Sequence, residues 1–196
     1  MSSIEQKYLY ELNNNDVDEQ EARSIQPIPM DNIEIMNLHI PNSKFLLYSE
    51  LSQYNSIEEL FSNVKSIILL YQPLHGNMGH FVCISLINNT FEYFCSYGGL
   101  DSIDRPIRDW YKDGQVCFLS NLLEKASKNL RIIYNKFQFQ KKSASISTCG
   151  RYAAFRAMTI NNSLSLPNFI DLMIYLKQKT NRPFDNIISD LINVVN

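Results

Sequence analysis

The chain has 196 residues, of which 45% are hydrophobic and 12% aromatic, and its formal net charge is -2 at pH 7. This size and composition are typical of one globular domain and exclude a chain that is disordered throughout. The small net charge argues against a nucleic-acid-binding surface spread over the whole fold. No apolar run approaches the roughly 20 residues that span a bilayer. We therefore expect a soluble monomer with no membrane or nucleic-acid partner.

The cysteines have no metal-binding spacing. Cys83, Cys95, Cys117 and Cys149 form no CxxC pair, and the three histidines are scattered along the chain. Structural zinc sites use closely spaced pairs of such ligands. We therefore expect free thiols, no metal and no cofactor.

The first half of the chain predicts a helix followed by strands. Residues 1–40 are interpreted as a loosely docked N-terminal extension with a polar helix, and residues 41–196 as a single domain. Ser56 and Glu59 have capping-box spacing, which predicts a helix directly after Ser56. A β-rich run, KSIILLYQPL, follows. The segment GHFVCISLINNTFEYFCSYGG then predicts a β-hairpin, because two apolar runs flank an Asn-rich turn.

The second half predicts mostly helices. The pattern indicates helices over 119–130, 149–159, 168–178 and 184–194, the last two with a proline near the first turn. RIIYNKFQFQ predicts a strand, and KKSASIS a loop. The order of elements predicts an α+β fold with a mainly antiparallel sheet flanked by segregated helices.

Cys149 lies where a polar loop meets the helix predicted at 149–159. Ser147 and Thr148 are good N-cap residues, so the cysteine would lie in the first helical turn. Backbone amides and the helix dipole favour negative charge there and would lower the pKa of the thiol. Gly150 would leave room for a substrate carbonyl. Cys149 is therefore a candidate nucleophile.

His80 is the candidate general base, because it opens the first strand of the predicted hairpin directly after Gly79. With an even hairpin loop, side-chain alternation places one apolar, core-directed set on a single face: His80, Val82, Ile84, Leu86, Phe91, Tyr93 and Cys95. The opposite face carries the more polar set Cys83, Ser85, Glu92 and Ser96. In KFQFQ the glutamines alternate with the phenylalanines, so Gln140, together with the backbone N–H of Cys149, could form a two-donor oxyanion hole.

These motifs, GHFVCISL, FEYFCSYGG, KFQFQ and STCGRYAAFRA in this order, resemble the adenovirus-type cysteine proteases, the adenain group. The resemblance covers roughly residues 65–160. It implies a papain-like fold with a permuted His-then-Cys order, in which His80 is the general base, Cys149 the nucleophile and Gln140 the oxyanion donor. It also implies a viral enzyme of large DNA viruses, virophages or related elements. Such an enzyme would act in the virion and the host-cell cytoplasm on capsid or core precursors.

Cys95 departs from the family pattern, because it occupies the place of the acid that orients the histidine. A thiol is normally neutral and supports an imidazolium poorly. Three readings stay open: a catalytic dyad, an acid from elsewhere, or an inactive relative. The candidate acids are Asp101, Asp104 and, less favourably, Glu92. A further hypothesis is that a disulfide between Cys95 and Cys149 silences the enzyme under oxidation.

The resemblance leaves the substrate open. The first hypothesis is an endopeptidase that matures viral structural precursors. The second is an isopeptidase that removes a ubiquitin-like modifier, although Phe81 stands where such enzymes usually have a tryptophan. The third is a non-catalytic virion protein that kept the fold.

Overall fold

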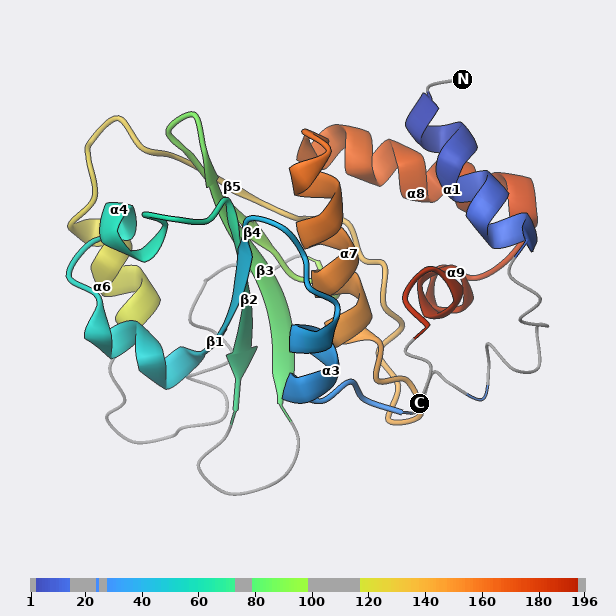
Figure 1. The fold of residues 1–196 in the computed structure, drawn as a ribbon, viewed down its shortest axis with the longest axis horizontal. Coiled ribbons are helices and arrows are strands. Elements are labelled where there is room, and N and C mark those ends of the chain that lie inside the picture. The colour runs from blue at the N-terminus through green and yellow to red at the C-terminus, as the bar shows by residue number, and fades with distance from the viewer. Residues whose placement is uncertain (1–2, 15–23, 25–27, 73–78, 99–116, 194–196) are drawn as a thin grey trace.

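The computed structural model describes residues 3–14, 24, 28–72, 79–98 and 117–193. A five-stranded sheet lies between two groups of helices (Figure 1). The strands are β1 (Ser43–Leu47), β2 (Ser66–Tyr71), β3 (His80–Ile87), β4 (Thr90–Phe94) and β5 (Arg131–Tyr134). The helices are α1 (Ser3–Asn14), α3 (Asn32–Asn37), the 3-10 helix η1 (Tyr48–Gln53), α4 (Ile57–Leu60), α6 (Phe118–Glu124), α7 (Cys149–Asn161), α8 (Leu166–Thr180) and α9 (Phe184–Leu191).

The sheet is mixed, which corrects the prediction of a mainly antiparallel one. Its strands follow in the order β1-β2-β3-β4-β5. The two inner pairs, β2 with β3 and β3 with β4, are antiparallel, whereas β1 pairs with β2 and β5 pairs with β4 in parallel. Parallel neighbours need a crossover connection. The segment with η1 and α4 makes the first crossover, and α6 lies in the second. The α+β class itself is confirmed.

The hairpin of β3 and β4 forms as the sequence predicts. Ile87 pairs with Thr90, so the loop has two residues. Asn88 and Asn89 have φ values of 46° and 59°, and positive φ at both positions is what a type I′ hairpin turn requires. The register pairs Ile84 with Tyr93. The even loop therefore puts the predicted apolar set, from His80 to Cys95, on one face.

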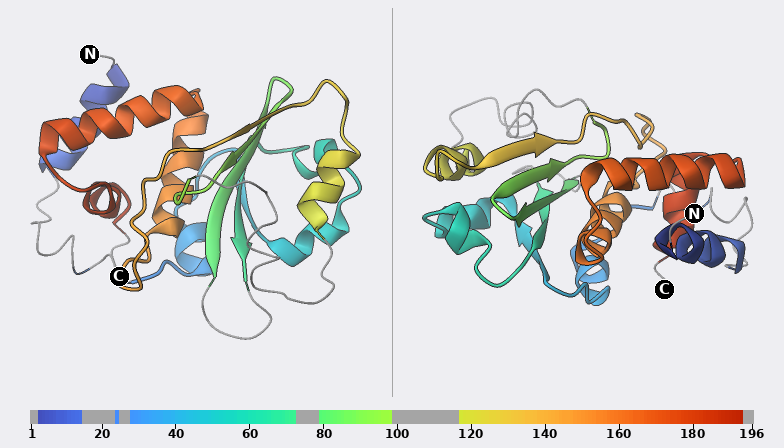
Figure 2. Two further views of the ribbon diagram at one scale, coloured as in Figure 1. Left: turned by 180° about the vertical axis from the view of Figure 1, so that it is seen from behind. Right: turned by 90° about the horizontal axis from the view of Figure 1, so that it is seen from above.

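Helices cover both faces of the sheet, and each face has its own core (Figure 2). On one side η1, α4 and α6 pack against the face that carries Val82, Ile84, Phe91 and Tyr93. On the other side α7 packs against β2 and β3, with α8, α9 and α1 behind it. All six residues of β2 are buried, because that strand is covered on both faces.

The face opposite His80 is buried under α7 and is not a polar surface. Cys83 lies in the core on that side. Glu92 accepts two hydrogen bonds from Arg156 of α7, at 2.7 and 2.8 Å. A bidentate pair of this kind satisfies both charges without water. The predicted polar face is therefore an internal contact that anchors α7 to β4.

The N-terminal segment packs more closely than the sequence predicts. Tyr8 and Leu12 of α1 are buried in the same core as α7, and the ring of Tyr8 meets that of Phe155 edge-on at 4.9 Å. Met30 and Ile35 join that core as well. Loose docking is therefore wrong for α1 and α3. The division of the chain at residue 40 stays a prediction.

Two further elements differ from their predicted extents. The helix predicted over 119–130 ends at Glu124, and the strand predicted over 131–140 ends at Tyr134. Phe137 and Phe139 do not alternate across a sheet with the glutamines; their rings lie 4.7 Å apart and both pack against the core of α7.

Candidate active site

Cys149 is the first residue of α7, as the sequence predicts. Thr148 is the N-cap, but its side chain makes no capping hydrogen bond. Its hydroxyl instead donates to Oδ1 of Asp185 at 2.6 Å. The side chain of Thr148 therefore accepts no hydrogen bond from the first backbone amides of α7.

The pKa of the Cys149 thiol is raised, not lowered as the sequence predicts. Burial is the largest cause, and it outweighs the backbone amides of Phe81, Gly150 and Cys149 itself and the charge of Arg151, all of which lower the pKa. The amides of a helix N-terminus do act on the sulfur, but desolvation of a thiolate costs more. The resting thiol is therefore protonated at neutral pH.

Gly150 has a packing role that corrects the predicted one. A Cβ atom at this position would lie 3.1 Å from Cβ of Met30 and 3.3 Å from Cδ2 of Phe81. The missing side chain therefore lets the start of α7 approach β3 and α3, and does not leave open space for a substrate carbonyl.

His80 is buried at the start of β3, with 6% of its surface exposed. Its ring stacks on Tyr97 at 5.1 Å, and Nε2 lies 3.2 Å from Sγ of Cys95. Burial lowers the pKa of His80 to about 4. The imidazole is therefore neutral near pH 7, as a general base must be.

Cys95 is buried beside His80, and burial raises its pKa to about 12. It is therefore a neutral thiol at the position where the resemblance calls for a carboxylate. The chain turns directly after it: the N–H of Gly98 donates to the carbonyl of Cys95 at 3.0 Å. Gly98 has a φ of 60°, and a Cβ there would lie 2.6 Å from the carbonyl of Phe137. The turn thus needs glycine.

Cys149 begins α7 near the start of β3, where His80 lies, and the two side chains are not hydrogen bonded to each other in this structure. The amide of Phe81, the residue after His80, acts on the Cys149 sulfur. A charge on that sulfur raises the pKa of both Cys95 and Tyr97, whose side chains contact the imidazole. Catalytic hydrogen bonds are often long in unliganded sites and shorten when substrate binds.

Gln140 is fully buried and tied to the end of β4. Its backbone N–H donates to the carbonyl of Ser96 at 3.0 Å, and its Oε1 accepts from Oγ of Ser96 at 2.7 Å. The amide group is thereby fixed in one orientation. Nε2 donates to the carbonyl of Ile146 at 3.2 Å, and its second hydrogen is the one that an oxyanion could use.

Sequence reasoning missed two residues that hold this site together. Asn135 Nδ2 donates to the carbonyls of Cys95 and Phe137, at 2.7 and 2.9 Å. Asp185 of α9 accepts from the N–H of Lys141 at 3.0 Å and from Thr148. Neither residue lies in a recognisable motif, and their bonds to Cys95, Lys141 and Thr148 join segments distant in sequence.

Of the alternative acids, only Glu92 lies in the described part of the chain, and it is not beside His80. Glu92 is engaged by Arg156 on the other face of the sheet, which removes it as a partner of the imidazole. Asp101 and Asp104 lie outside the described residues. Cys95 and Cys149 are free thiols here; a disulfide between them under oxidation stays a prediction.

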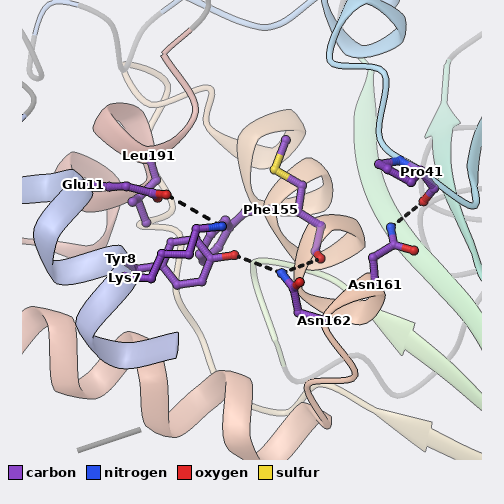
Figure 3. A pocket seen from close by; sticks show the side chains of 9 residues that line it. Lys7, Tyr8, Glu11, Pro41, Phe155, Asn161, Asn162 and Leu191 are labelled. Carbon is purple, nitrogen blue, oxygen red and sulfur yellow. Dashed lines mark hydrogen bonds and ion pairs between the residues drawn. The ribbon is translucent and has the colours of Figure 1, made fainter. Parts of the chain in front are cut away.

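A surface pocket of about 480 Å³ lies away from these residues, where α1 meets the C-terminal half of α7 (Figure 3). Tyr8 and Asn162 line it, and Asn162 Nδ2 lies 3.5 Å from the hydroxyl of Tyr8. The start and end of α7 are roughly 18 Å apart at the helical rise per residue. This pocket is therefore not the cleft of the candidate site.

Among the described residues there is no group of three or more His, Cys, Asp or Glu side chains placed to hold a metal ion. Within the same part of the chain, no helix has the length and apolarity needed to cross a membrane.

Comparisons with known proteins show distant similarities. No family model matches the chain. The uncharacterized protein V9 of Sputnik virophage is 29% identical over 143 residues, which cover 70% of this chain and 80% of that protein. Among solved structures, the SUMO protease Ulp1 with its catalytic cysteine oxidized to a sulfonic acid is 13% identical, with a TM-score of 0.42 over 98% of both chains. The central domain of Lpg1148 from Legionella pneumophila is 14% identical, with a TM-score of 0.37 over 78% of this chain and 97% of that one.

Proposed function

We propose that this protein is a cysteine peptidase in which Cys149 is the nucleophile, His80 the general base and Gln140 an oxyanion donor. One observation carries the proposal: three segments far apart in sequence meet at one end of the sheet, and they bring a thiol, an imidazole and a side-chain amide. A thiol lies at the N-terminus of α7, a neutral imidazole lies at the start of β3, and an amide is clamped to the end of β4.

The mechanism follows from the protonation states. Both the thiol and the imidazole are neutral at rest, because burial raises the pKa of Cys149 and lowers that of His80. Nε2 of His80 is engaged with Cys95, so Nδ1 is the nitrogen that would receive the thiol proton. The sulfur then bonds to the substrate carbonyl carbon. Gln140 Nε2 and the backbone N–H of Cys149 would stabilise the resulting oxyanion.

The second half of the reaction returns the proton. The imidazolium gives it to the leaving amine as the carbon–nitrogen bond breaks, which leaves a thioester on Cys149. A water molecule, deprotonated by His80, then hydrolyses the thioester and releases the acid product. In this scheme Cys95 holds the ring but cannot neutralise the imidazolium, so the site works as a dyad.

For the substrate we propose a viral capsid or core precursor, processed in the virion or host cytoplasm by an adenain-type enzyme. The similarity to a protein of Sputnik virophage supports a viral setting. The alternative is an isopeptidase acting on a ubiquitin-like modifier. The site chemistry serves both substrates equally, because each reaction attacks a carbonyl joined to nitrogen.

The test is cleavage of candidate structural proteins of the same genome and of a ubiquitin-like fusion, with cut sites determined by mass spectrometry. We expect cleavage by the wild type and by Cys117→Ala, which removes a thiol outside the site, and none by Cys149→Ala. A thiol-reactive peptide probe should label Cys149 in the wild type. Failure to label it anywhere between about pH 6 and 9 would show that the protein is not a cysteine peptidase.

A further inference from the structure

Asp185, in the first turn of α9, contacts both ends of the loop between Gln140 and Cys149. Oδ2 accepts the backbone N–H of Lys141 at 3.0 Å, and Oδ1 accepts the hydroxyl of Thr148 at 2.6 Å. Lys141 directly follows the proposed oxyanion donor, and Thr148 directly precedes the proposed nucleophile. One carboxylate therefore closes the loop of residues 141–148 at its two ends.

Closing the loop fixes the distance between two groups that must act on the same carbonyl. Gln140 is held from one side by Ser96 at the end of β4, and Cys149 belongs to α7. The eight residues between them contain three serines and two lysines and form no helix or strand. Besides the bond from Gln140 Nε2 to Ile146 within the loop, the Asp185 cross-link joins the two loop ends, and catalytic efficiency depends steeply on such geometry.

The same carboxylate also directs the hydroxyl of Thr148. A threonine at the N-cap ordinarily accepts a hydrogen bond from an amide of the first turn. Here its hydroxyl donates to Asp185, and its side chain makes no cap bond. The amides of Cys149 and Gly150 act on the sulfur instead. Asp185 thus holds Thr148, and with it the first turn of α7, whose amides reach the sulfur.

Asp185 is well enclosed for this role, with 5% of its surface exposed. Its charge acts on Tyr97, whose ring stacks on His80, but the groups that shift the pKa of Cys149 do not include it. Its effect on the nucleophile is therefore one of position and not of charge.

We propose that Asp185 is a positioning residue. It holds the start of α7 at a fixed distance from the proposed oxyanion donor, and it keeps the first amides of α7 directed at Cys149. The inference rests on the proposed function, because it concerns the same nucleophile and oxyanion donor.

The experiment measures the rate of alkylation of Cys149 by iodoacetamide as a function of pH, by mass spectrometry of the peptide that contains it. The test variants are Thr148→Val, which removes only the hydroxyl, and Asp185→Asn, which removes the charge and one acceptor. Thr148→Ser should keep the contact. Asp190→Asn is the matched control, because Asp190 is buried on the same helix but pairs with Arg182.

We expect Thr148→Val and Asp185→Asn to raise the pKa of Cys149 by about one unit and so to slow alkylation at pH 7 about tenfold. Thr148→Ser should retain the wild-type profile. Asp190→Asn should lower the melting temperature without moving the profile. If Asp185→Asn does not fold, Thr148→Val decides alone, since it leaves every charge in place.

If Thr148→Val is alkylated at pH 7 at a rate within twofold of the wild type, the inference is overturned. Opposite shifts in the two variants would overturn it as well, because that pattern indicates a charge effect. Alkylation needs no peptide substrate, so this result is independent of the cleavage assay. A chain that alkylates as expected but cuts nothing refutes the proposed function alone.

Discussion

Replacing Cys95 with aspartate should convert His80 from a weak base into one matched to neutral pH. In the wild type Nε2 of His80 lies 3.2 Å from Sγ of Cys95, which burial keeps neutral. Burial of the imidazole lowers its pKa from 6.5 to about 4. A carboxylate at the same position would favour the protonated ring, because opposite charges in contact stabilise each other.

The size of the effect follows from the distance. Two unit charges about 3.2 Å apart attract by about 5 kcal/mol at an effective dielectric constant near 20, which corresponds to nearly four pKa units. Part of that energy offsets the desolvation of the new carboxylate in a site where Cys95 is 2% exposed. We expect a net rise of about two to three units, which brings the pKa of His80 to between about 6 and 7.

The assay is NMR titration of the imidazole C–H resonances, with His80→Gln used to assign the resonance. Cys95→Ser is the matched control, because it keeps a neutral group of similar size, and its His80 should still titrate near the wild-type value. Peptide cleavage at pH 7 should be faster in Cys95→Asp. If His80 of a folded Cys95→Asp variant still titrates below about pH 5, the assigned role of residue 95 is wrong.

Three further predictions concern stability, each measured by urea denaturation. Between pH 6.5 and 4 the unfolded chain binds a proton at His80 that the folded chain does not. The free energy of unfolding of the wild type should therefore fall by about 3 kcal/mol as the pH falls through this window. In His80→Gln this pH-dependent loss of stability should be absent. If the free energy of unfolding depends on pH equally in both proteins, the prediction is wrong. Glu92→Gln leaves the buried Arg156 guanidinium without its charge partner and should cost about 3–5 kcal/mol, without altering the titration of His80; a cost below about 1 kcal/mol would show that the pair is not effectively buried. Gly150→Ala places a Cβ 3.3 Å from Phe81 and should cost about 1–3 kcal/mol; an unchanged midpoint would mean that α7 shifts freely.

Local patterns predicted the parts of this molecule that depend on neighbouring residues. The two-residue loop at Asn88 and Asn89 forms because asparagine tolerates positive φ, and side-chain alternation then determines which residues share a face with His80. The start of α7 at Cys149 also follows from local signals, since small polar residues precede a helical run.

Other predictions failed because distant segments compete for the same groups. The pattern at Ser147 and Thr148 predicted a cap, but Asp185 takes the hydroxyl of Thr148. Gly150 was predicted to face substrate, but Met30 and Phe81 fill that space. Residues 135–140 do not continue β5, because the amides of Phe139 and Gln140 both bond to the carbonyl of Ser96.

By itself, the sequence predicted most of the helices and strands, though not α3 or β1, together with the hairpin register and the candidates Cys149, His80 and Gln140. Each of these depends on short-range periodicity or on a motif. Tertiary structure alone decided the ionisation of the site, since the pKa of a thiol or imidazole depends on the water excluded by residues far along the chain. It also decided which group contacts which partner among the described residues: Glu92 binds Arg156, Asp185 binds Thr148, and His80 contacts the thiol of Cys95. Those pairings are long-range, and no local pattern in the chain encodes them.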